Sequence, residues 1–196
     1  MNRRIIVLSA GVMLAGIALP AAAQYPTRPP APLPLAPTKF PPFQQVKLAN
    51  GLDLLVVENH EHPVVSLRLV LPAGSRYEPA GKEGLADLTA ELLTKGTATR
   101  TADQISAAIE GVGASLDASA GADVMNLESD VLSDHVDLAF TLMGDAIRNS
   151  TFPDAEVSLA RTREVSAVRL EASQPASIAA RAFDAALYGN HPYGQH

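Results

Sequence analysis

The segment GLADLTAELLTKGT, residues 84–97, has the pattern of an α-helix that ends before Gly96. On a helical wheel its apolar residues fill a continuous arc of about 200°, so we expect most of the helix to be buried. The arc comprises Leu85, Ala86, Leu88, Ala90, Leu92 and Leu93, with Thr89 inside it. The narrow exposed stripe carries Asp87 and Glu91, two acidic residues one helical turn apart. This stripe is therefore acidic, and it holds no histidine.

Strands are predicted on the N-terminal side of this helix. Two alternating runs within residues 44–59 flank Asn50-Gly51. This dipeptide favours a hairpin with a type I′ turn, in which both residues take positive φ. The apolar run in residues 63–74 predicts a third strand, and a glycine-containing loop then leads into the helix.

More helices and one more hairpin are predicted on the C-terminal side. The helices are expected over residues 101–113, 133–149, 151–175 and 176–189, and two strands with a turn near Gly121 over residues 114–132. Thr101 and Ser133 are suited to be N-caps, and Pro153 to begin a helix. Because strands come first and helices follow with a hairpin among them, we expect an α+β fold with a mainly antiparallel sheet packed with helices.

The N-terminus resembles a bacterial export signal. Arg3 and Arg4 precede an apolar stretch that ends at Leu19, and small residues follow up to residue 23. The stretch is shorter than the about 20 residues that span a bilayer, so we expect residues 1–23 to be a cleaved signal peptide rather than a membrane anchor. The mature protein is then periplasmic or secreted, without stable membrane insertion.

Proline-rich residues 24–42 predict an extended tether, and residues 43–196 a folded domain. No closing element follows the turn-like NHPYG at residues 190–194, so the domain is expected to be incomplete at its C-terminus. The chain has no cysteine, which excludes disulfides and a lipid-modified N-terminal cysteine. A net charge of −6 without a basic cluster argues against nucleic-acid partners.

Several motifs occur in one order along the chain. They are LANGLDLLVVEN, LPAGSRYEPAGKEGLADLTAELLTKGT, TADQISAAIEGVGASLDASAGAD, FPDAEV and NHPYG. Together they resemble the N-terminal half-barrel of the M16 metallopeptidases, the family of insulinase, pitrilysin and mitochondrial processing peptidase. The resemblance covers roughly residues 43–196 and implies an M16/LuxS-like metallopeptidase fold.

Active M16 members carry an inverted zinc motif, H-x-x-E-H, on the helix that corresponds to residues 84–97. Its two histidines bind zinc, and its glutamate activates water. The resemblance matches the first histidine to Asp87, the glutamate to Ala90 and the second histidine to Glu91. It therefore implies that this chain has no catalytic residue, no metal ligand and no cofactor, and that zinc is carried only by a partner subunit.

The third zinc ligand of the family is a glutamate on the helix that FPDAE opens. The equivalent position lies near Ala167 to Arg169, and Glu164 and Glu171 are each about one turn away. No matching ligand is evident at the equivalent position. As an alternative, Asp87 and Glu91 alone could hold a hard cation, but such sites normally use more oxygen ligands than two. A solvated acidic stripe is the preferred interpretation.

The strand within GASLDASAGAD suggests a peptide site. In M16 relatives the matching strand lends its backbone edge to an extended peptide, which is β-augmentation. The resemblance places Leu116, Asp117 and Ala118 at this edge, with Asp117 where an asparagine is usual. An ordinary sheet strand is an equally good interpretation of the same residues.

The histidines offer weaker candidates. His60 and His62 form an H-x-H pair, for which a polar turn is the better interpretation because only two ligands are adjacent. His135 is expected at the surface, and His191 and His196 lie near the C-terminus. The absence of a G-x-S-x-G motif and of cysteine argues against a nucleophilic triad.

The leading hypothesis is an exported, catalytically inactive M16-type homologue. It would be the non-zinc partner subunit of a heterodimeric periplasmic zinc peptidase, and would help to enclose and bind peptides. The alternative is a free-standing envelope protein that binds peptides or acts as a scaffold. A third hypothesis is an active metallopeptidase with an atypical carboxylate metal site.

Overall fold

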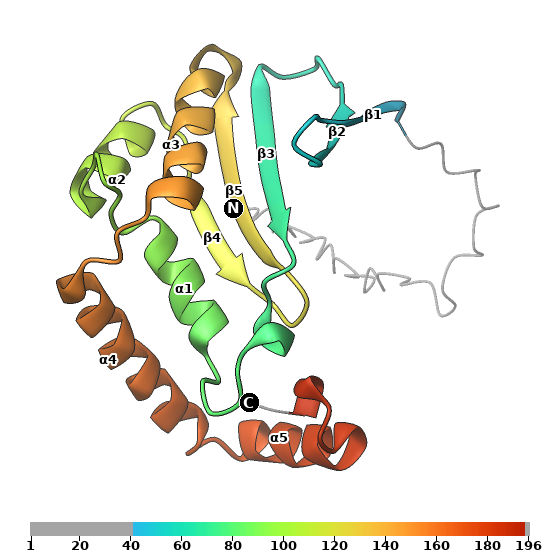
Figure 1. Cartoon of the computed structure of the whole chain (residues 1–196), viewed down its shortest axis with the longest axis vertical. Coiled ribbons are helices and arrows are strands. Elements are labelled where there is room, and N and C mark those ends of the chain that lie inside the picture. The colour runs from blue at the N-terminus through green and yellow to red at the C-terminus, as the bar shows by residue number, and fades with distance from the viewer. Residues whose placement is uncertain (1–40, 195–196) are drawn as a thin grey trace, which may run out of the picture. The chain divides into compact units, whose positions relative to one another are not determined.

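The computed structural model describes residues 41–194 (Figure 1). The chain divides into two compact units, and the boundary in the sequence lies between Glu58 and Asn59. The predicted signal peptide, the predicted tether up to residue 40, and His196 lie outside the described residues. Within residues 41–194, no helix combines the length and apolarity needed to cross a membrane.

The described part of the first unit is a hairpin of β1 (Phe43–Lys47) and β2 (Asp53–Val57). The hairpin prediction is confirmed, but the predicted type I′ turn is wrong. Leu48 and Leu52 still pair, through a bond of 2.8 Å from the Leu48 N–H to the Leu52 carbonyl, so a three-residue loop connects the strands. Within this loop, Gly51 alone has positive φ, at 89°. Asn50 instead accepts a hydrogen bond from the Leu52 N–H through its side chain, at 3.1 Å.

The second unit contains a three-stranded antiparallel sheet in the order β3-β5-β4. Its strands are β3 (Val64–Leu71), β4 (Asp117–Ala120) and β5 (Met125–Leu132). Leu127 in the central strand lies between Leu69 of β3 and Ala118 of β4. The predicted antiparallel sheet is confirmed, and within residues 41–194 β4 pairs with no strand other than β5.

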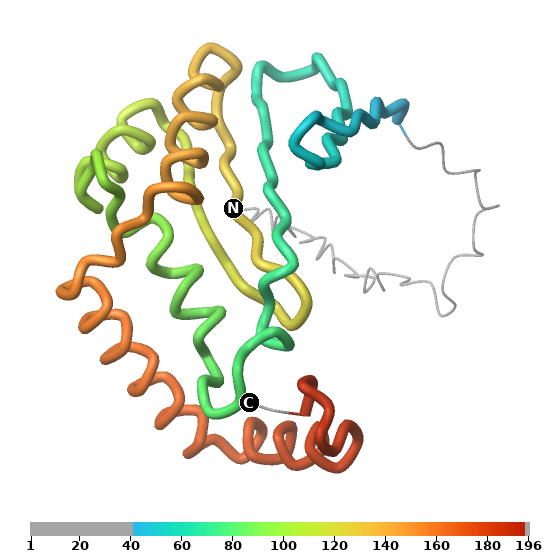
Figure 2. The backbone as a smooth tube through the Cα atoms, viewed as in Figure 1, coloured from blue at the N-terminus to red at the C-terminus, as the bar shows by residue number. Residues whose placement is uncertain are grey.

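Within residues 41–194, five helices follow the predicted order. They are α1 (Leu85–Leu93), α2 (Ala102–Glu110), α3 (Val136–Asn149), α4 (Asp154–Glu171) and α5 (Pro175–Tyr188). Short 3-10 turns occupy Ser75–Tyr77, Ser133–His135 and Pro192–Gly194. Figure 1 shows α1 and α3 covering one face of the sheet, and the tube in Figure 2 shows α4 running beside α1.

One of the two predicted N-caps is confirmed. Thr101 caps α2 in a capping box, in which the Gln104 N–H donates to the Thr101 hydroxyl and the Gln104 side chain accepts from the Thr101 N–H. The Ser133 prediction is wrong. Ser133 begins a 3-10 turn and makes no capping bond, so α3 starts at Val136.

The core lies between the sheet and helices α1 and α3. One cluster joins Ala90 and Leu93 of α1 to Met125 of β5, and a second joins Leu127 of β5 to Met143 and Ala146 of α3. The opposite face of the sheet is mixed, because it carries an ion pair between Arg68 and Glu128 at 2.9 Å and also the exposed side chains of Val64, Val70 and Leu132. Helices α1 and α3 therefore cover one face of the sheet, and the core lies on that side.

The predicted buried arc of α1 is too wide. Ala86, Ala90, Leu92 and Leu93 are buried, but Leu85 is 42% exposed and Leu88 only half-buried. Leu85 and Leu88 line an apolar groove between α1 and α4, together with Val165 and Val168. The helix therefore has two apolar sides, and only one of them reaches the core.

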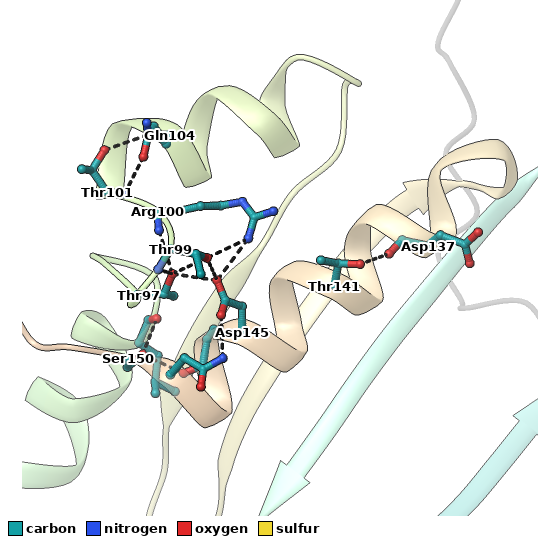
Figure 3. A network of polar contacts seen from close by, with 12 residues as sticks. Thr97, Thr99, Arg100, Thr101, Gln104, Asp137, Thr141, Asp145 and Ser150 are labelled. Atoms are coloured by element: carbon teal, nitrogen blue, oxygen red, sulfur yellow. Dashed lines mark hydrogen bonds and ion pairs between the residues drawn. The ribbon is translucent and has the colours of Figure 1, made fainter.

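A buried carboxylate holds the segment that connects α1 to α2 (Figure 3). Asp145 of α3 accepts hydrogen bonds from the hydroxyls of Thr97 and Thr99 at 2.7 and 2.8 Å, and from Arg100 at 3.1 Å. Its second oxygen accepts from the Asn149 amide at 2.8 Å. The bonds from Thr97, Asn149 and Thr99, in that order of effect, lower the pKa of Asp145 from 3.8 to about 2. Asp145 thereby fixes the position of α2 relative to α1.

Candidate functional site

The three positions matched to the zinc motif all lie on α1, but their side chains have different surroundings. Ala90 is 2% exposed and belongs to the core. Asp87 is exposed and Glu91 is half-buried. The start of this helix is held by Glu78, whose carboxylate accepts hydrogen bonds from the Gly84 and Ala86 N–H groups at 3.1 and 2.6 Å.

Asp87 lines a cavity of about 430 Å³ between the start of α1 and α4. The α4 residues that line it are Glu164, Ala167, Val168 and Glu171, which share one face of that helix. Ala167, from the segment matched to the third zinc ligand, therefore lies at the same cavity as Asp87. Although Asp87 as a whole is exposed, partial desolvation of its carboxyl group raises the pKa of Asp87, and the negative charge of Glu78 raises it further. The carboxylate of Glu171 is already paired with Arg181 at 2.9 Å.

Glu91 lines a different cavity. Its carboxylate accepts a hydrogen bond from Arg163 of α4 at 3.1 Å, in an ion pair that joins the two helices. The carboxylates of Asp87 and Glu91 are one turn apart on α1, yet they line different cavities and do not face a common site. Within residues 41–194, no group of three histidine, cysteine, aspartate or glutamate side chains is placed to hold a metal ion.

The cavity at Glu91 is a groove of about 540 Å³ along β4. Residues from α1, α2, the N-terminal half of α4 and residues 114–118 line it. Ala90, Ile105 and Ile109 are buried at its base, whereas Asp103, Glu110 and Asp117 are exposed. The groove therefore has an apolar floor and a charged rim.

The free edge of β4 borders this groove. Hydrogen bonds to β5 alternate along an antiparallel strand. The Ser115 N–H donates to Asp130 at 3.1 Å, and the Gly121 N–H to Val124 at 2.8 Å, so positions 115, 117, 119 and 121 face β5. Leu116 and Ala118 consequently turn their backbone groups to the free edge. Of the predicted peptide-binding residues, all three line the groove, but the Asp117 backbone faces β5.

The histidines are scattered. His60 and His62 lie in the segment between β2 and β3, and His135 immediately precedes α3. The ring of His191 stacks edge-on against Tyr193, whose hydroxyl donates to Asp123 at 2.8 Å. Residues of the NHPYG segment therefore anchor the end of α5 to the turn between β4 and β5. Sequence reasoning missed Glu78 and Arg163, because no local pattern marks either of them as a neighbour of α1.

The sequence matches the profile of the insulinase family, peptidase family M16, over residues 54–196. The chain belongs to the M16 peptidase family. Several curated relatives are named uncharacterized zinc proteases. One from Rickettsia bellii is 34% identical over 59% of this chain and 28% of its own length, and one from Rickettsia felis is 32% identical over 78% and 37%. The mitochondrial-processing peptidase subunit alpha of Solanum tuberosum is 30% identical over 85% of this chain and 32% of its own length.

Two solved structures share this fold. The crystal structure of a peptidase M16 inactive domain from Pseudomonas fluorescens superposes with a TM-score of 0.75 at 28% identity, over 79% of this chain and 38% of the other. A protease from Helicobacter pylori superposes with a TM-score of 0.72 at 22% identity, over the same shares. This M16 chain spans about a third of the length of the relatives it matches.

The residues at the positions matched to the motif do not fit a zinc ion. Ala90 carries no donor atom, the segment Ala167 to Arg169 contains no carboxylate, and the carboxylate of Glu91 is bound to a guanidinium. Among the matched positions, Asp87 is therefore the one remaining possible ligand, whereas zinc sites in proteins use three or four protein ligands. Arg163 of α4 supplies from within the protein the positive charge that faces the Glu91 carboxylate of α1.

Proposed function

We propose that this chain is an exported, catalytically inactive M16 homologue. It acts as the non-zinc partner subunit of a heterodimeric periplasmic zinc peptidase and helps to enclose and bind the peptide. The observation that supports the proposal is the loss of zinc ligands and of the general base on α1 and α4. Alanine stands at the position of the base, no glutamate lies in the segment Ala167 to Arg169 matched to the third ligand, and Arg163 binds Glu91. A chain without a set of metal ligands and without a general base cannot activate a water molecule for peptide hydrolysis.

Two similar proteins support this role. One is named an inactive domain of peptidase M16, and another is named as one subunit of a mitochondrial-processing peptidase. Export is supported by the signal-like sequence of residues 1–23, which lies outside the described residues. Zinc and the cutting activity are assigned to the partner subunit.

Two preparations of the full chain test the proposal. One is the chain produced and purified alone, and the other is the chain purified from its native cell together with any bound partners. Elemental analysis of the isolated chain is expected to find no stoichiometric zinc, and fluorogenic peptides should remain uncut. From the native cell, a zinc-bearing M16 chain is expected to co-purify. Stoichiometric zinc together with peptide turnover by the isolated chain would overturn the proposal and favour an atypical carboxylate metal site at Asp87 and Glu91.

A second candidate function is a free-standing envelope protein that binds peptides without an M16 partner. It is favoured by the groove along β4, because the floor, the rim and the strand edge of that groove all come from this one chain. Co-purification separates the two functions. The free-standing role predicts peptide binding without a zinc-bearing M16 chain.

Peptide binding at the strand edge leads to a prediction for Ala118→Pro. The Ala118 N–H faces the free edge, so proline there removes a donor to the peptide but no bond to β5. The probes are three fluorescein-labelled decapeptides, in which threonine alternates with lysine, glutamine or glutamate. We expect fluorescence anisotropy to show about tenfold weaker binding by the variant, since one backbone hydrogen bond and close approach are lost.

The control for Ala118→Pro is its urea unfolding curve, which should stay cooperative. If the variant is folded and binds all three peptides as tightly as the wild-type chain, the edge of β4 is not the peptide site. If the wild-type chain binds none of the three peptides, both functions proposed above fail.

A further inference from the structure

The apolar groove between α1 and α4 lies on a different side of α1 from the positions matched to the zinc motif. It has a volume of about 510 Å³, and its apolar lining is formed by Leu85, Leu88, Val165 and Val168. Leu85 and Val165 are each 42% exposed and Val168 is 49% exposed, so aliphatic surface along the groove is open to solvent. A groove of this size with a mainly aliphatic lining is typical of a binding site for an apolar ligand.

Positive charge borders this groove. Its rim carries three cationic residues, which are Lys82, Arg161 and Arg169. Within residues 41–194, none of these three side chains forms an ion pair. Two acidic residues, Glu83 and Glu164, also line the groove, but both line the cavity at Asp87 as well. With three cationic against two acidic residues, the groove is positive in a chain whose net charge is −6.

The cationic residues lie at the two ends of the groove. Helices α1 and α4 run antiparallel (Figure 1), because the end of α1 is paired with Arg163 and its start shares a cavity with Ala167. Arg169 therefore lies towards the start of α1, which Lys82 precedes, and Arg161 lies towards the end of α1. Arg161 and Arg169 are eight residues apart on α4, which corresponds to about 12 Å along the helix axis. The aliphatic side chains occupy the space between these two ends.

We propose that this groove binds a free single-chain amphiphile with an anionic head group, such as a fatty acid. The aliphatic chain of the ligand covers the exposed leucine and valine side chains, and its carboxylate lies at the end where Lys82 and Arg169 provide two positive charges. A guanidinium suits this ligand, because it can form two parallel hydrogen bonds with a carboxylate. A free molecule is favoured over a lipid within a membrane, since the net charge of −6 opposes approach to an anionic bilayer surface. The inference goes beyond the proposed function and does not depend on it.

Isothermal titration calorimetry with the full chain at low ionic strength tests the inference, with three amphiphiles kept below their micelle concentrations. We expect one dodecanoate molecule to bind per chain with a dissociation constant of about 50 µM. Dodecyltrimethylammonium has the same aliphatic chain and the opposite charge, and it should bind at least about tenfold more weakly. Octanoate should also bind at least about tenfold more weakly, because fewer methylene groups are buried.

Two results with these probes would overturn the inference. One is equal binding of dodecanoate and dodecyltrimethylammonium, and the other is no binding of dodecanoate. If the chain adsorbs to anionic phospholipid vesicles but does not bind dodecanoate, the ligand is a membrane lipid and the inference fails as well.

A pair of matched variants locates the bound aliphatic chain. Val165→Ser with Val168→Ser makes the groove polar. Leu159→Ser with Leu170→Ser makes the same kind of change at two exposed positions of α4 that do not line the groove. We expect the first pair to bind dodecanoate at least about tenfold more weakly and the second pair to bind it as the wild-type chain does. An equal loss in both pairs would overturn the inference.

A second pair of variants tests the head group. Arg169→Gln removes one charge at the groove, and Arg148→Gln removes one exposed charge on α3, which does not line the groove. We expect Arg169→Gln alone to bind dodecanoate about threefold more weakly, with dodecyltrimethylammonium binding unchanged. Urea unfolding curves identify the variants that are folded. If the valine variant is unfolded, Arg169→Gln decides, and wild-type affinity of Arg169→Gln for dodecanoate would overturn the inference.

Discussion

Asp145→Ala is expected to lower the free energy of unfolding by about 3 kcal/mol, because it removes a buried carboxylate that binds four side chains. The hydroxyl of Thr97 would remain buried without its acceptor, and Arg100 would lose its ion pair. The measurement is a urea unfolding curve at neutral pH. Since Asp145 also holds the segment between α1 and α2, the variant should bind peptide less tightly in the groove.

The control for this prediction is Asp137→Ala. Asp137 is an exposed carboxylate in the first turn of the same helix, and its loss is expected to cost no more than about 0.5 kcal/mol. Equal destabilisation by the two variants would show that the hydrogen bonds of Asp145 drawn in Figure 3 do not specifically stabilise the fold.

The low pKa of Asp145 also predicts a pH dependence. A carboxylate whose pKa is about 2 in the folded state and 3.8 otherwise adds stability that is complete above the higher value and is lost as the pH falls through the lower one. The stability difference between the wild-type chain and Asp145→Ala should therefore shrink by about 2 kcal/mol between about pH 5 and about pH 2. A difference that stays constant over this range would contradict the assigned cause.

Local patterns in the sequence predicted the elements of this fold well. Helical periodicity located all five helices, and Thr101 with Gln104 marked the start of α2 because a capping box involves only neighbouring residues. The Asn50-Gly51 turn was predicted with the wrong type, since the alternative in which Asn50 accepts a bond through its side chain has the same sequence. Ser133 failed as a cap because a 3-10 turn can also begin at serine.

The contacts that define the site are separated far along the chain, and no local pattern reveals them. Glu91 and Arg163 are 72 positions apart, and Thr97 and Asp145 are 48 apart. The helical wheel of α1 likewise predicted that Leu85 is buried in the core, although its side chain lines a groove next to α4. The family resemblance located α1 and the β4 edge. The ion-pair partner of Glu91 and the separate cavity at Asp87 are visible only in the three-dimensional structure.

Restoring zinc ligands should convert α1 and α4 into a metal site. Asp87→His, Glu91→His and Ala167→Glu together supply the three ligands of the family motif, and we expect one zinc ion per chain with a dissociation constant below about 1 µM. Asp87 and Ala167 already line one cavity, and both are exposed, so the new side chains have room. Isothermal titration calorimetry with zinc alone measures the affinity, and elemental analysis the stoichiometry.

The base at position 90 is left out of this variant for a structural reason. Ala90 is 2% exposed and packs against Leu93 and Met125, so Ala90→Glu would bury a carboxylate and cost several kcal/mol. The matched control keeps Ala167 and changes only Asp87 and Glu91 to histidine. We expect it to bind zinc at least tenfold more weakly, because one of three ligands is missing. Equal affinity would place the third ligand elsewhere on α4, and no binding by either variant would show that α1 is not the scaffold of an M16 zinc site.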